Sequence, residues 1–146
     1  MTDARWNTRR LYKFESEFFR GHKLNKSLPM AVLRKLAEKV WLDHEAPTGG
    51  SHFFTSGGPN IRAGRGVMYN GYLYSYYQKD EGIVLARNQR TIPILLHELT
   101  HTILSDYVDF NDDHSQKFVD LYFDLLWQYA GLGRTELMRA RIKYKI

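Results

Sequence analysis

Residues 91–104, TIPILLHELTHTIL, constrain the fold of this chain more than any other segment. Thr91 is a suitable N-cap for a helix, and Pro93 fits the first turn, where no intrahelical N–H is needed. The apolar residues that follow lie on nearly all sides of such a helix: Ile94, Leu95, Leu96, Leu99, Ile103 and Leu104. A helix that is hydrophobic all round is buried. The segment therefore predicts a central helix inside the domain.

The same segment carries two histidines in the pattern His-Glu-x-x-His. On a helix, His97 and His101 lie on one face within reach of one metal ion, and Glu98 lies beside them. Zinc lowers the pKa of its bound water towards ~7, and a glutamate in this position takes the proton as the water attacks a carbonyl. A buried helix that carries two histidines by chance is the alternative, so a third ligand has to decide.

The first candidate for the third ligand is His114, which follows His101 after the twelve residues TILSDYVDFNDD. A turn of this length returns the start of the next helix to the middle of its predecessor. Asp120 is the second candidate because a carboxylate on the next helix could serve instead. Asp109 and Asp113 follow it in rank.

Any zinc in this chain has to be held by His, Asp or Glu, because the chain has no cysteine. Catalytic zinc usually keeps three protein ligands and one open position. We therefore expect one Zn²⁺ ion at His97, His101 and His114, with Glu98 as the general base. Aspartates of the acidic run 106–124 are expected to accept hydrogen bonds from the histidine rings. The remaining histidines have no metal-like spacing: His22, His44 and His52.

The size and charge of the chain fit one globular domain with basic ends. It has 146 residues, 43% of them hydrophobic, which predicts a single domain over 1–146. It lacks an apolar signal core and a membrane-length apolar run, so we expect a cytoplasmic protein with no membrane partner. The net charge of +5 is unevenly spread: basic residues outnumber acidic ones in residues 1–41 and 134–146, and the chain between them is acidic. These ends are candidates for nucleic-acid contact, although a solvated basic surface is the simpler interpretation.

Helical spacing predicts four further helices. Residues 6–20 place Leu11, Phe14, Phe18 and Phe19 on one face. A second helix opens at Ser27 and Pro29, and Thr48-Gly49-Gly50 ends it. Its apolar stripe is Val32, Leu33, Leu36, Val40 and Trp41. A third begins after Asp113 as N-cap, with Gln116 in a capping box, and ends at Gly131. A short basic helix over about 135–141 closes the chain.

Residues 51–86 change to the alternating period of strands. Val67–Tyr69, Asn70-Gly71 and Tyr72–Tyr76 predict a hairpin with a two-residue type I′ turn. Pairing Tyr69 with Tyr72 would align one face of mainly tyrosine side chains: Val67, Tyr69, Tyr72, Tyr74 and Tyr76. We expect this face to pack on the core, with stacking of bases or aromatic ligands as the alternative. Gly82–Ala86 is the next strand, so a small antiparallel sheet precedes the His-Glu-x-x-His helix.

With these residues in place, the chain resembles zincins of the SprT-like or minimal-metallopeptidase type. It more closely resembles the small uncharacterised HExxH metallopeptidase-like proteins of actinobacteria and their phages. The likeness spans most of the chain in order: Thr8–Tyr12, Gly82–Leu85, Leu96–His101, His114–Val119 and Leu121–Leu126. The metzincin pattern is excluded, because it needs Gly and His where this chain has Leu104 and Tyr107. Two departures are Ser115, where glycine is usual, and the lack of a following zinc ribbon.

The resemblance implies an α+β zincin-like single domain. It would have N-terminal helices, a small antiparallel sheet with a hairpin, the HExxH helix and a C-terminal helix that carries the third ligand. The implied activity is zinc-dependent hydrolysis of peptide bonds, in a host cytoplasm if the protein is phage-encoded. In zincins an edge strand binds the substrate peptide, and Gly82–Ala86 or the hairpin are candidates for it. Tyr107 and Arg90 are candidates for the oxyanion donor by proximity in sequence.

Two other functions stay open from the sequence. The first is a structural or interaction protein that keeps the metal for stability and has lost turnover, and the absence of a cleft at the metal would favour it. The second is a nucleic-acid-associated protease that uses its basic ends, which salt-sensitive binding to DNA would favour.

Overall fold

A computed structural model describes residues 4–44, 54–55, 58–69, 71–78, 82–105 and 114–146. These ranges contain the helices α1 (Ala4–Phe18), α2 (Met30–Asp43), α3 (Ile92–Ser105), α4 (Gln116–Tyr129) and α5 (Arg134–Tyr144). Their strands are β1 (Phe54–Thr55), β2 (Gly58–Pro59), β3 (Ile61–Gly64), β4 (Val67–Tyr69), β5 (Tyr72–Tyr74), β6 (Tyr76–Gln78) and β7 (Gly82–Ala86). The chain is thus an α+β domain, as the sequence predicts.

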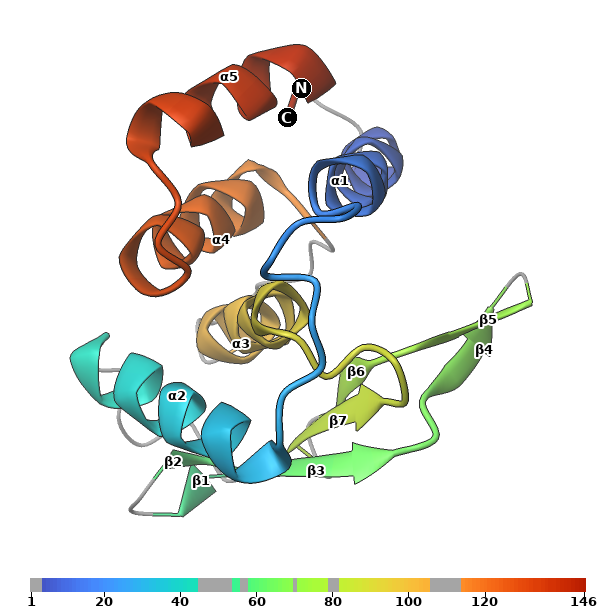
Figure 1. Ribbon diagram of the computed structural model, residues 1–146, viewed down its shortest axis with the longest axis vertical. Coiled ribbons are helices and arrows are strands. Elements are labelled where there is room, and N and C mark those ends of the chain that lie inside the picture. Colours follow the sequence, from blue (N-terminus) through green and yellow to red (C-terminus); the bar gives the residue numbers. More distant parts are fainter. Residues whose placement is uncertain (1–3, 45–53, 56–57, 70, 79–81, 106–113) are drawn as a thin grey trace.

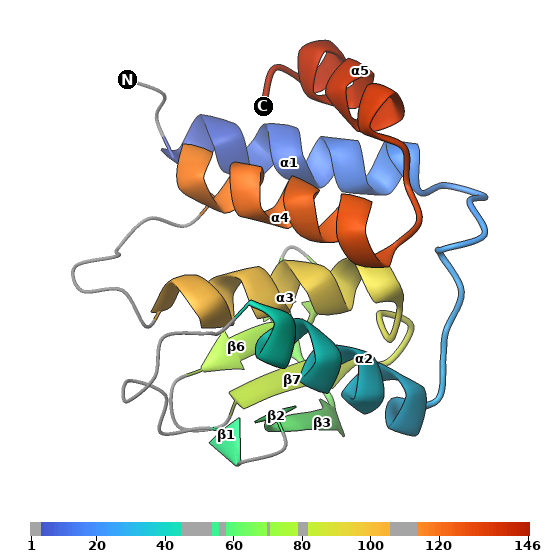
Figure 2. The same cartoon turned by 90° about the vertical axis from the view of Figure 1, so that its left-hand side faces the viewer.

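Helix α3 lies at the centre of the domain (Figure 1). The sheet of β3, β7 and β6 covers one side of α3, while α1 and α4 lie on the other side and α5 lies outermost (Figure 2). Along α3 the apolar residues Leu95, Leu96 and Leu99 are buried, and so are His97 and Glu98. The predicted central buried helix is confirmed. Its N-terminus also agrees with the prediction, because the Ile94 N–H donates to Thr91 Oγ1 at 3.4 Å.

The sheet beside α3 is mixed, not antiparallel as expected. Its strand order is β3-β7-β6, with β3 parallel to β7 and β6 antiparallel to it. Every residue of β7 is buried, and its run GIVLA suits a strand that is covered on both faces. Strand β7 is therefore central, and the described edges of this sheet are β3 and β6. Strand β3 was not predicted, because the short segment IRAG buries only Ile61 and so shows no alternation of apolar and polar residues.

The hairpin forms in the predicted register, with Tyr69 opposite Tyr72 and Val67 opposite Tyr74. Asn70 lies outside the described residues, and Gly71 has φ +81°. The expectation that Tyr76 continues this hairpin is wrong, because Tyr76 belongs to β6 and pairs with Val84. The chain changes sheet at Ser75, whose Oγ accepts from the Ala86 N–H at 2.8 Å. The Ser75 side chain thus bonds to β7 at the point where the chain leaves the hairpin and enters the sheet of β3, β7 and β6.

The predicted helix 6–20 forms as α1, which begins at Ala4 and ends at Phe18. Pro29 is the N-cap of α2, and Val32, expected in its apolar stripe, is 48% exposed. The predicted end of that helix at 48–50 lies outside the described residues. Helix α5 runs to Tyr144, one turn past the predicted end.

The expected N-cap of α4 is wrong. Ser115 caps the helix, and its side chain accepts from the Phe118 N–H, while Asp113 lies outside the described residues. Gln116 makes no capping box, because its amide donates forward to Asp120. The helix ends at Tyr129 and Gly131 follows it with φ +75°, as predicted. In the described part of the chain, no helix is long and apolar enough to cross a membrane.

Candidate metal centre

Three histidines converge on one side of α3: two belong to α3 itself, and the third lies just before α4. His97 and His101 lie one turn apart on α3, with ring centroids 5.2 Å apart. His114 comes from the residue before the N-cap of α4, and one nitrogen from each ring lies within 4.8 Å of the others. His97 and His114 are buried and His101 is half-buried. The structure therefore brings together the three residues predicted as ligands, close enough to hold one metal ion.

The backbone of His114 takes a conformation that is uncommon for a side-chain-bearing residue. Its φ is +66°, in the left-handed region where histidine, asparagine and aspartate are the more tolerant residues. Strained backbone of this kind is concentrated at functional sites, where the surrounding structure enforces it. Here it turns the chain into α4 directly after His114, with the ring directed at α3.

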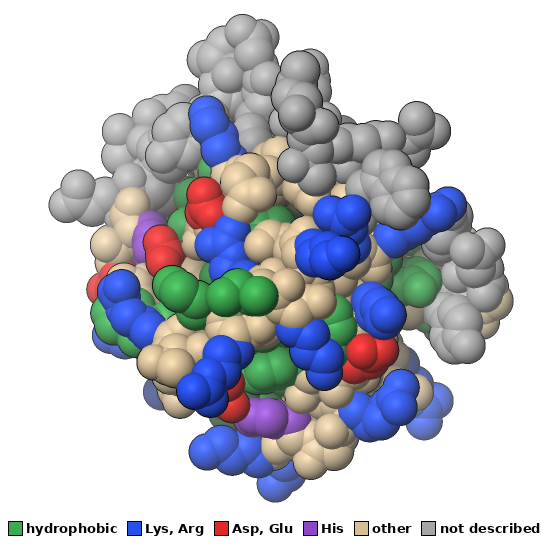
Figure 3. All heavy atoms as spheres, turned by 90° about the horizontal axis from the view of Figure 1, so that it is seen from above, with side chains coloured by type: hydrophobic (Ala, Val, Ile, Leu, Met, Phe, Trp, Pro, Cys, Tyr) green, Lys and Arg blue, Asp and Glu red, His purple; other side chains and the backbone are tan. Residues whose placement is uncertain are grey.

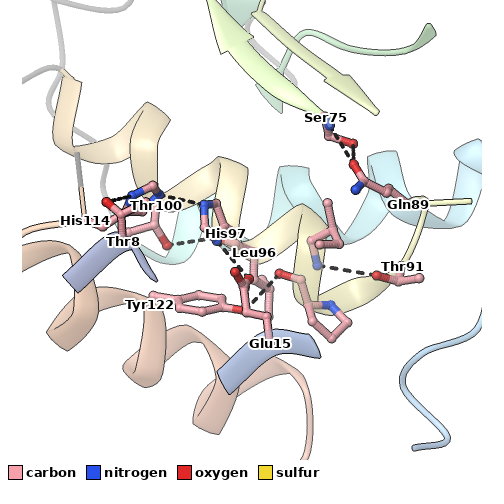
Figure 4. Close-up of polar contacts among 12 residues, drawn as sticks. Thr8, Glu15, Ser75, Gln89, Thr91, Leu96, His97, Thr100, His114 and Tyr122 are labelled. Atoms are coloured by element: carbon pink, nitrogen blue, oxygen red, sulfur yellow. Dashed lines mark hydrogen bonds and ion pairs between the residues drawn. The ribbon is translucent and has the colours of Figure 1, made fainter. Parts of the chain in front are cut away.

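Helix α1 supplies partners for the outer nitrogens of two of these rings (Figure 4). His97 Nδ1 lies 2.9 Å from Glu15 Oε2, and because a carboxylate only accepts, this nitrogen donates. His114 Nδ1 lies 2.9 Å from Thr8 Oγ1. Glu15 also accepts from the Tyr122 hydroxyl at 2.9 Å. These contacts fix the orientation of both rings and leave each Nε2 directed at the other.

The Nε2 atoms of His97 and His114 are placed where both could bind one cation. His97 Nε2 and His114 Nε2 are 3.0 Å apart. If both rings carry their proton on Nδ1, two lone pairs face each other at this distance, and a bound cation would satisfy both. Zinc–nitrogen bonds of about 2.0–2.1 Å in tetrahedral geometry place two ligand nitrogens roughly 3.4 Å apart. One nitrogen of His101 lies within 4.8 Å of the ligand nitrogens of the other two rings, so the residues present fit a three-histidine zinc site.

The two histidines without a carboxylate partner are held neutral. Burial and the charge of His97 lower the pKa of His114 to about 3. Burial, followed by the charges of His97 and His114, lowers the pKa of His101 well below its usual value. For His97, burial also opposes protonation, but the charge and hydrogen bond of Glu15 prevail and its pKa is raised. Only a neutral imidazole binds a metal, so His101 and His114 are ready ligands at neutral pH.

Glu98 is a buried carboxyl beside the cluster, with 6% of its surface exposed. Burial raises its pKa to about 7, while the charge of His97 opposes the shift and that of Glu15 adds to it. A group with a pKa near the working pH is effective in general acid–base catalysis. The predicted base therefore lies in an environment that suits the role.

Aromatic rings shield the histidines from water. The Phe118 ring lies 4.5–5.0 Å, centroid to centroid, from all three histidine rings. From α1, the Tyr12 ring stacks on His97 at 6.1 Å and meets His114 edge-on at 5.4 Å. Interactions between charges are stronger in such an apolar enclosure than in water.

A cavity of about 240 Å³ opens beside the site. It lies between α1, the end of β5 and α3, and its lining includes both Glu98 and His97. A molecule in this cavity would reach the buried carboxyl and one of the three histidines. The cavity therefore meets the cluster at Glu98 and His97, and its lining does not include His101 or His114.

The alternative third ligand, Asp120, is not at the site. Its side chain is 57% exposed and pairs with Arg141 at 2.7 Å. Asp109, Asp113 and Tyr107 lie outside the described residues. Arg90, a candidate oxyanion donor, does not line the cavity, and its Nε donates to the Leu85 carbonyl at 3.4 Å.

The sequence missed the hydrogen-bond partners of the histidines. We expect them among the aspartates of 106–124, of which those in 106–113 lie outside the described residues and Asp120 and Asp124 are exposed. The partners found are Thr8 and Glu15 of α1. A signal for them was present: residues 8, 12 and 15 recur at i, i+4 and i+7, on one face of a helix. Such a face is hard to recognise from sequence, because its residues are polar or aromatic and the apolar stripe of α1 lies beside it.

Comparison with known proteins adds no relative: no family model, curated protein or solved structure matches this chain. The assignment of the site therefore depends on its geometry and chemistry.

Proposed function

We propose that this chain is a zinc-dependent peptidase that binds one zinc ion through His97, His101 and His114. The observation that carries the proposal is the buried Glu98 beside the three-histidine cluster, at the wall of an open cavity. Burying an ionised carboxyl costs free energy, and the group responds with a raised pKa. Together with the perturbed pKa values around it, this marks the cluster as a candidate catalytic site.

The roles of the residues follow from their contacts. A zinc ion held there would act as a Lewis acid and lower the pKa of a bound water towards ~7. Glu98 would take the proton of the attacking water and pass it to the leaving amine. Glu15 holds the His97 ring by its Nδ1, and Thr8 contacts Nδ1 of His114. These two residues of α1 keep both Nε2 atoms directed inward during the reaction.

The first experiment is elemental analysis of protein purified without a metal-affinity tag. We expect about one zinc per chain in the wild type and in Glu98→Gln, and a large loss in His114→Ala. Glu136→Gln, a substitution of an exposed glutamate on α5, is the matched control and should keep its zinc. A wild type that stays metal-free after addition of zinc would reject the site.

The second experiment measures cleavage of a mixed peptide library by mass spectrometry. We expect cleavage by the wild type and by Glu136→Gln, and a loss of at least about a hundredfold in Glu98→Gln. If zinc is bound and no peptide is cut by any variant, the chain is a metal-stabilised binding protein instead. The cavity at Glu98 is the reason to rank the enzyme above that alternative.

A second candidate function is attachment to nucleic acid through one basic face. Helices α1 and α5 lie side by side, with Arg10 Nη1 donating to the Lys145 carbonyl at 3.2 Å. Lysine and arginine side chains gather on the face seen in Figure 3. The fold thus joins two basic segments from opposite ends of the sequence.

Titration of a fluorescent DNA duplex at several salt concentrations tests this second function. Binding to phosphates weakens steeply with salt, and each phosphate contact contributes a slope of about −0.9 in a plot of log K against log salt. Replacing the exposed Arg9, Lys13, Arg139 and Lys143 by glutamine should weaken binding and flatten the slope. If the substitutions leave DNA binding unchanged, the basic face is an ordinary solvated surface.

A further inference from the structure

The cavity beside Glu98 has an aromatic wall built from two distant parts of the chain. Tyr12 comes from α1 and Tyr74 from the end of β5, and their rings stack with centroids 6.0 Å apart and planes 24° apart. Ile94 on α3 adds an aliphatic surface to the lining. Tyr12 remains 39% exposed and Tyr74 is half-buried. The cavity thus offers apolar surface to a molecule that enters from solvent.

Another residue of the cavity lining, Gln89, carries a pair of amide N–H donors. Gln89 Oε1 accepts from the Ser75 N–H at 2.6 Å and from the Ser75 hydroxyl at 2.9 Å. These two contacts fix the orientation of the amide, with its NH₂ group on the side away from Ser75 (Figure 4). Within the described part of the chain, no residue accepts a hydrogen bond from this NH₂ group. It is therefore available to a carbonyl oxygen in the cavity.

The size of the cavity limits what it can hold. Its volume of about 240 Å³ exceeds the roughly 150 Å³ of an engineered apolar cavity that binds benzene. It is smaller than the range of about 300–1,000 Å³ that is usual for whole small-molecule ligands. One large side chain with an adjoining peptide group fits between these limits.

The two carboxyl groups in the cavity lining, Glu15 and Glu98, already have roles in the proposed metal site. Glu15 Oε2 accepts from both His97 and the Tyr122 hydroxyl. Glu98 is kept largely apart from solvent. The apolar surfaces of the lining are those of the stacked tyrosines and Ile94, which offer contact to a ring or a branched chain.

We propose that this cavity holds a bulky aromatic or aliphatic side chain of the substrate peptide, next to the bond that is cut, and that the Gln89 amide donates to an adjoining peptide carbonyl. The inference rests on the proposed peptidase function for the identity of the ligand. It goes further in naming the residue type that is selected and the groups that select it. Neither the histidines nor Glu98 determine that choice.

Binding of small probes tests the inference without any need for turnover. The probes are the N-acetyl amides of phenylalanine, leucine, alanine and lysine, titrated into zinc-loaded wild type and followed by NMR chemical shifts. We expect the phenylalanine and leucine probes to bind at least about tenfold more tightly than the alanine probe. Equal binding of phenylalanine and alanine, or tightest binding of lysine, would overturn the inference.

Two variants test separately the aromatic wall and the hydrogen bond from the Gln89 amide. Tyr74→Ala should reduce the preference for phenylalanine over alanine to within about twofold, whereas Trp127→Ala, which alters an exposed ring outside the cavity, should leave it intact. Gln89→Glu keeps the oxygen that accepts from Ser75 and removes the donors. It should weaken all uncharged probes by a similar factor without changing their order. If Tyr74→Ala binds like the wild type while its unfolding curve is unchanged, the aromatic wall does not select the ligand.

The peptide library distinguishes failure of this inference from failure of the proposed function. Cleavage without preference for a bulky residue at one side of the cut keeps the peptidase and rejects the cavity assignment. Selective probe binding without any cleavage keeps the cavity assignment as a peptide-binding site and rejects the peptidase.

Discussion

The two ring nitrogens of His97 have different tasks. Nδ1 donates to Glu15 and Nε2 lies 3.0 Å from His114 Nε2. A carboxylate on the outer nitrogen fixes the tautomer and raises the basicity of the inner one, which strengthens metal binding. At the scale of single residues, the proposed zinc affinity of the site would therefore depend on Glu15 as well as on the histidines.

We predict that Glu15→Gln weakens zinc binding by about 10–100-fold, the usual cost of losing such an outer partner. The amide keeps the size of the side chain and can still accept from His97, so the change isolates the charge. Competition with a chromophoric chelator measures the affinity. Glu17→Gln is the control, since Glu17 accepts from Tyr144 instead of a histidine. Equal affinities for the wild type and Glu15→Gln would contradict the role of Glu15.

We predict that Glu98→Gln stabilises the metal-free protein at high pH. Burial raises the pKa of Glu98 from 4.5 to about 7. The stability linked to this group is complete below pH 4.5 and is lost as the pH rises through 7. By pH 8 that loss amounts to about 3 kcal/mol. Glutamine does not titrate, so the variant should unfold at higher urea concentration than the wild type at pH 8 in EDTA, and at a similar concentration at pH 4.5. If the unfolding midpoints of the variant and the wild type differ by the same amount at both pH values, burial of the Glu98 charge is not the cause of the difference.

At the scale of elements, helix α1 packs into the core with one face and contacts the histidine cluster with another. Leu11 and Phe14 are fully buried in the core, while Thr8, Tyr12 and Glu15 contact the histidines. Strand β7 has a different task, because it runs through the centre of the sheet and leads into α3. Both elements therefore set the position of the site without supplying a ligand.

We predict that Gly82→Ala is much more destabilising than Gly71→Ala. Both glycines have positive φ, +79° and +81°, which costs an alanine about 1–2 kcal/mol. A Cβ at Gly82 would also collide with the Asn60 carbonyl, whereas one at Gly71 meets nothing within 4 Å. The collision should add about 1–3 kcal/mol, and urea unfolding of both variants measures the difference. Equal losses of unfolding free energy in the two variants would mean that the backbone at Asn60 moves enough to remove the collision.

At the scale of the whole molecule, the site joins helices that are remote in sequence. The contact between Glu15 and His97 spans 82 residues, and that between Thr8 and His114 spans 106. A ligand that binds only the folded state stabilises it in proportion to its affinity. A metal ion between α3 and the start of α4, braced by α1, would therefore act on the stability of the entire domain.

We predict that zinc at about a thousand times its dissociation constant stabilises the wild type by about 4 kcal/mol. For a chain of this length the melting temperature should rise by roughly 8–16 °C, and EDTA should reverse the rise. His114→Ala should melt at the same temperature with and without zinc. A zinc-dependent rise in His114→Ala as large as that of the wild type would exclude His114 as a ligand.

The sequence by itself determined the central helix, the strand Gly82–Ala86, the hairpin register and the histidine cluster. These depend on local spacing: His97 and His101 are neighbours on any helix, and a run such as GIVLA has no polar face to leave in water. The third member of the cluster, His114, was predictable because it follows His101 after only twelve residues, next to the start of the following helix. The N-cap of α4 was not predictable, since Asp and Ser are about equally good N-cap residues and local sequence does not distinguish Asp113 from Ser115.

Only the tertiary structure decided which residues surround the site. Glu15 and Thr8 are ordinary polar residues of an amphipathic helix until α1 packs across α3 and α4. The parallel pairing of β3 with β7 and the stacking of Tyr12 on Tyr74 likewise join segments far apart in the chain. Local patterns carry no information on such pairings, because the free energy that selects them comes from burying the surfaces of several elements at once.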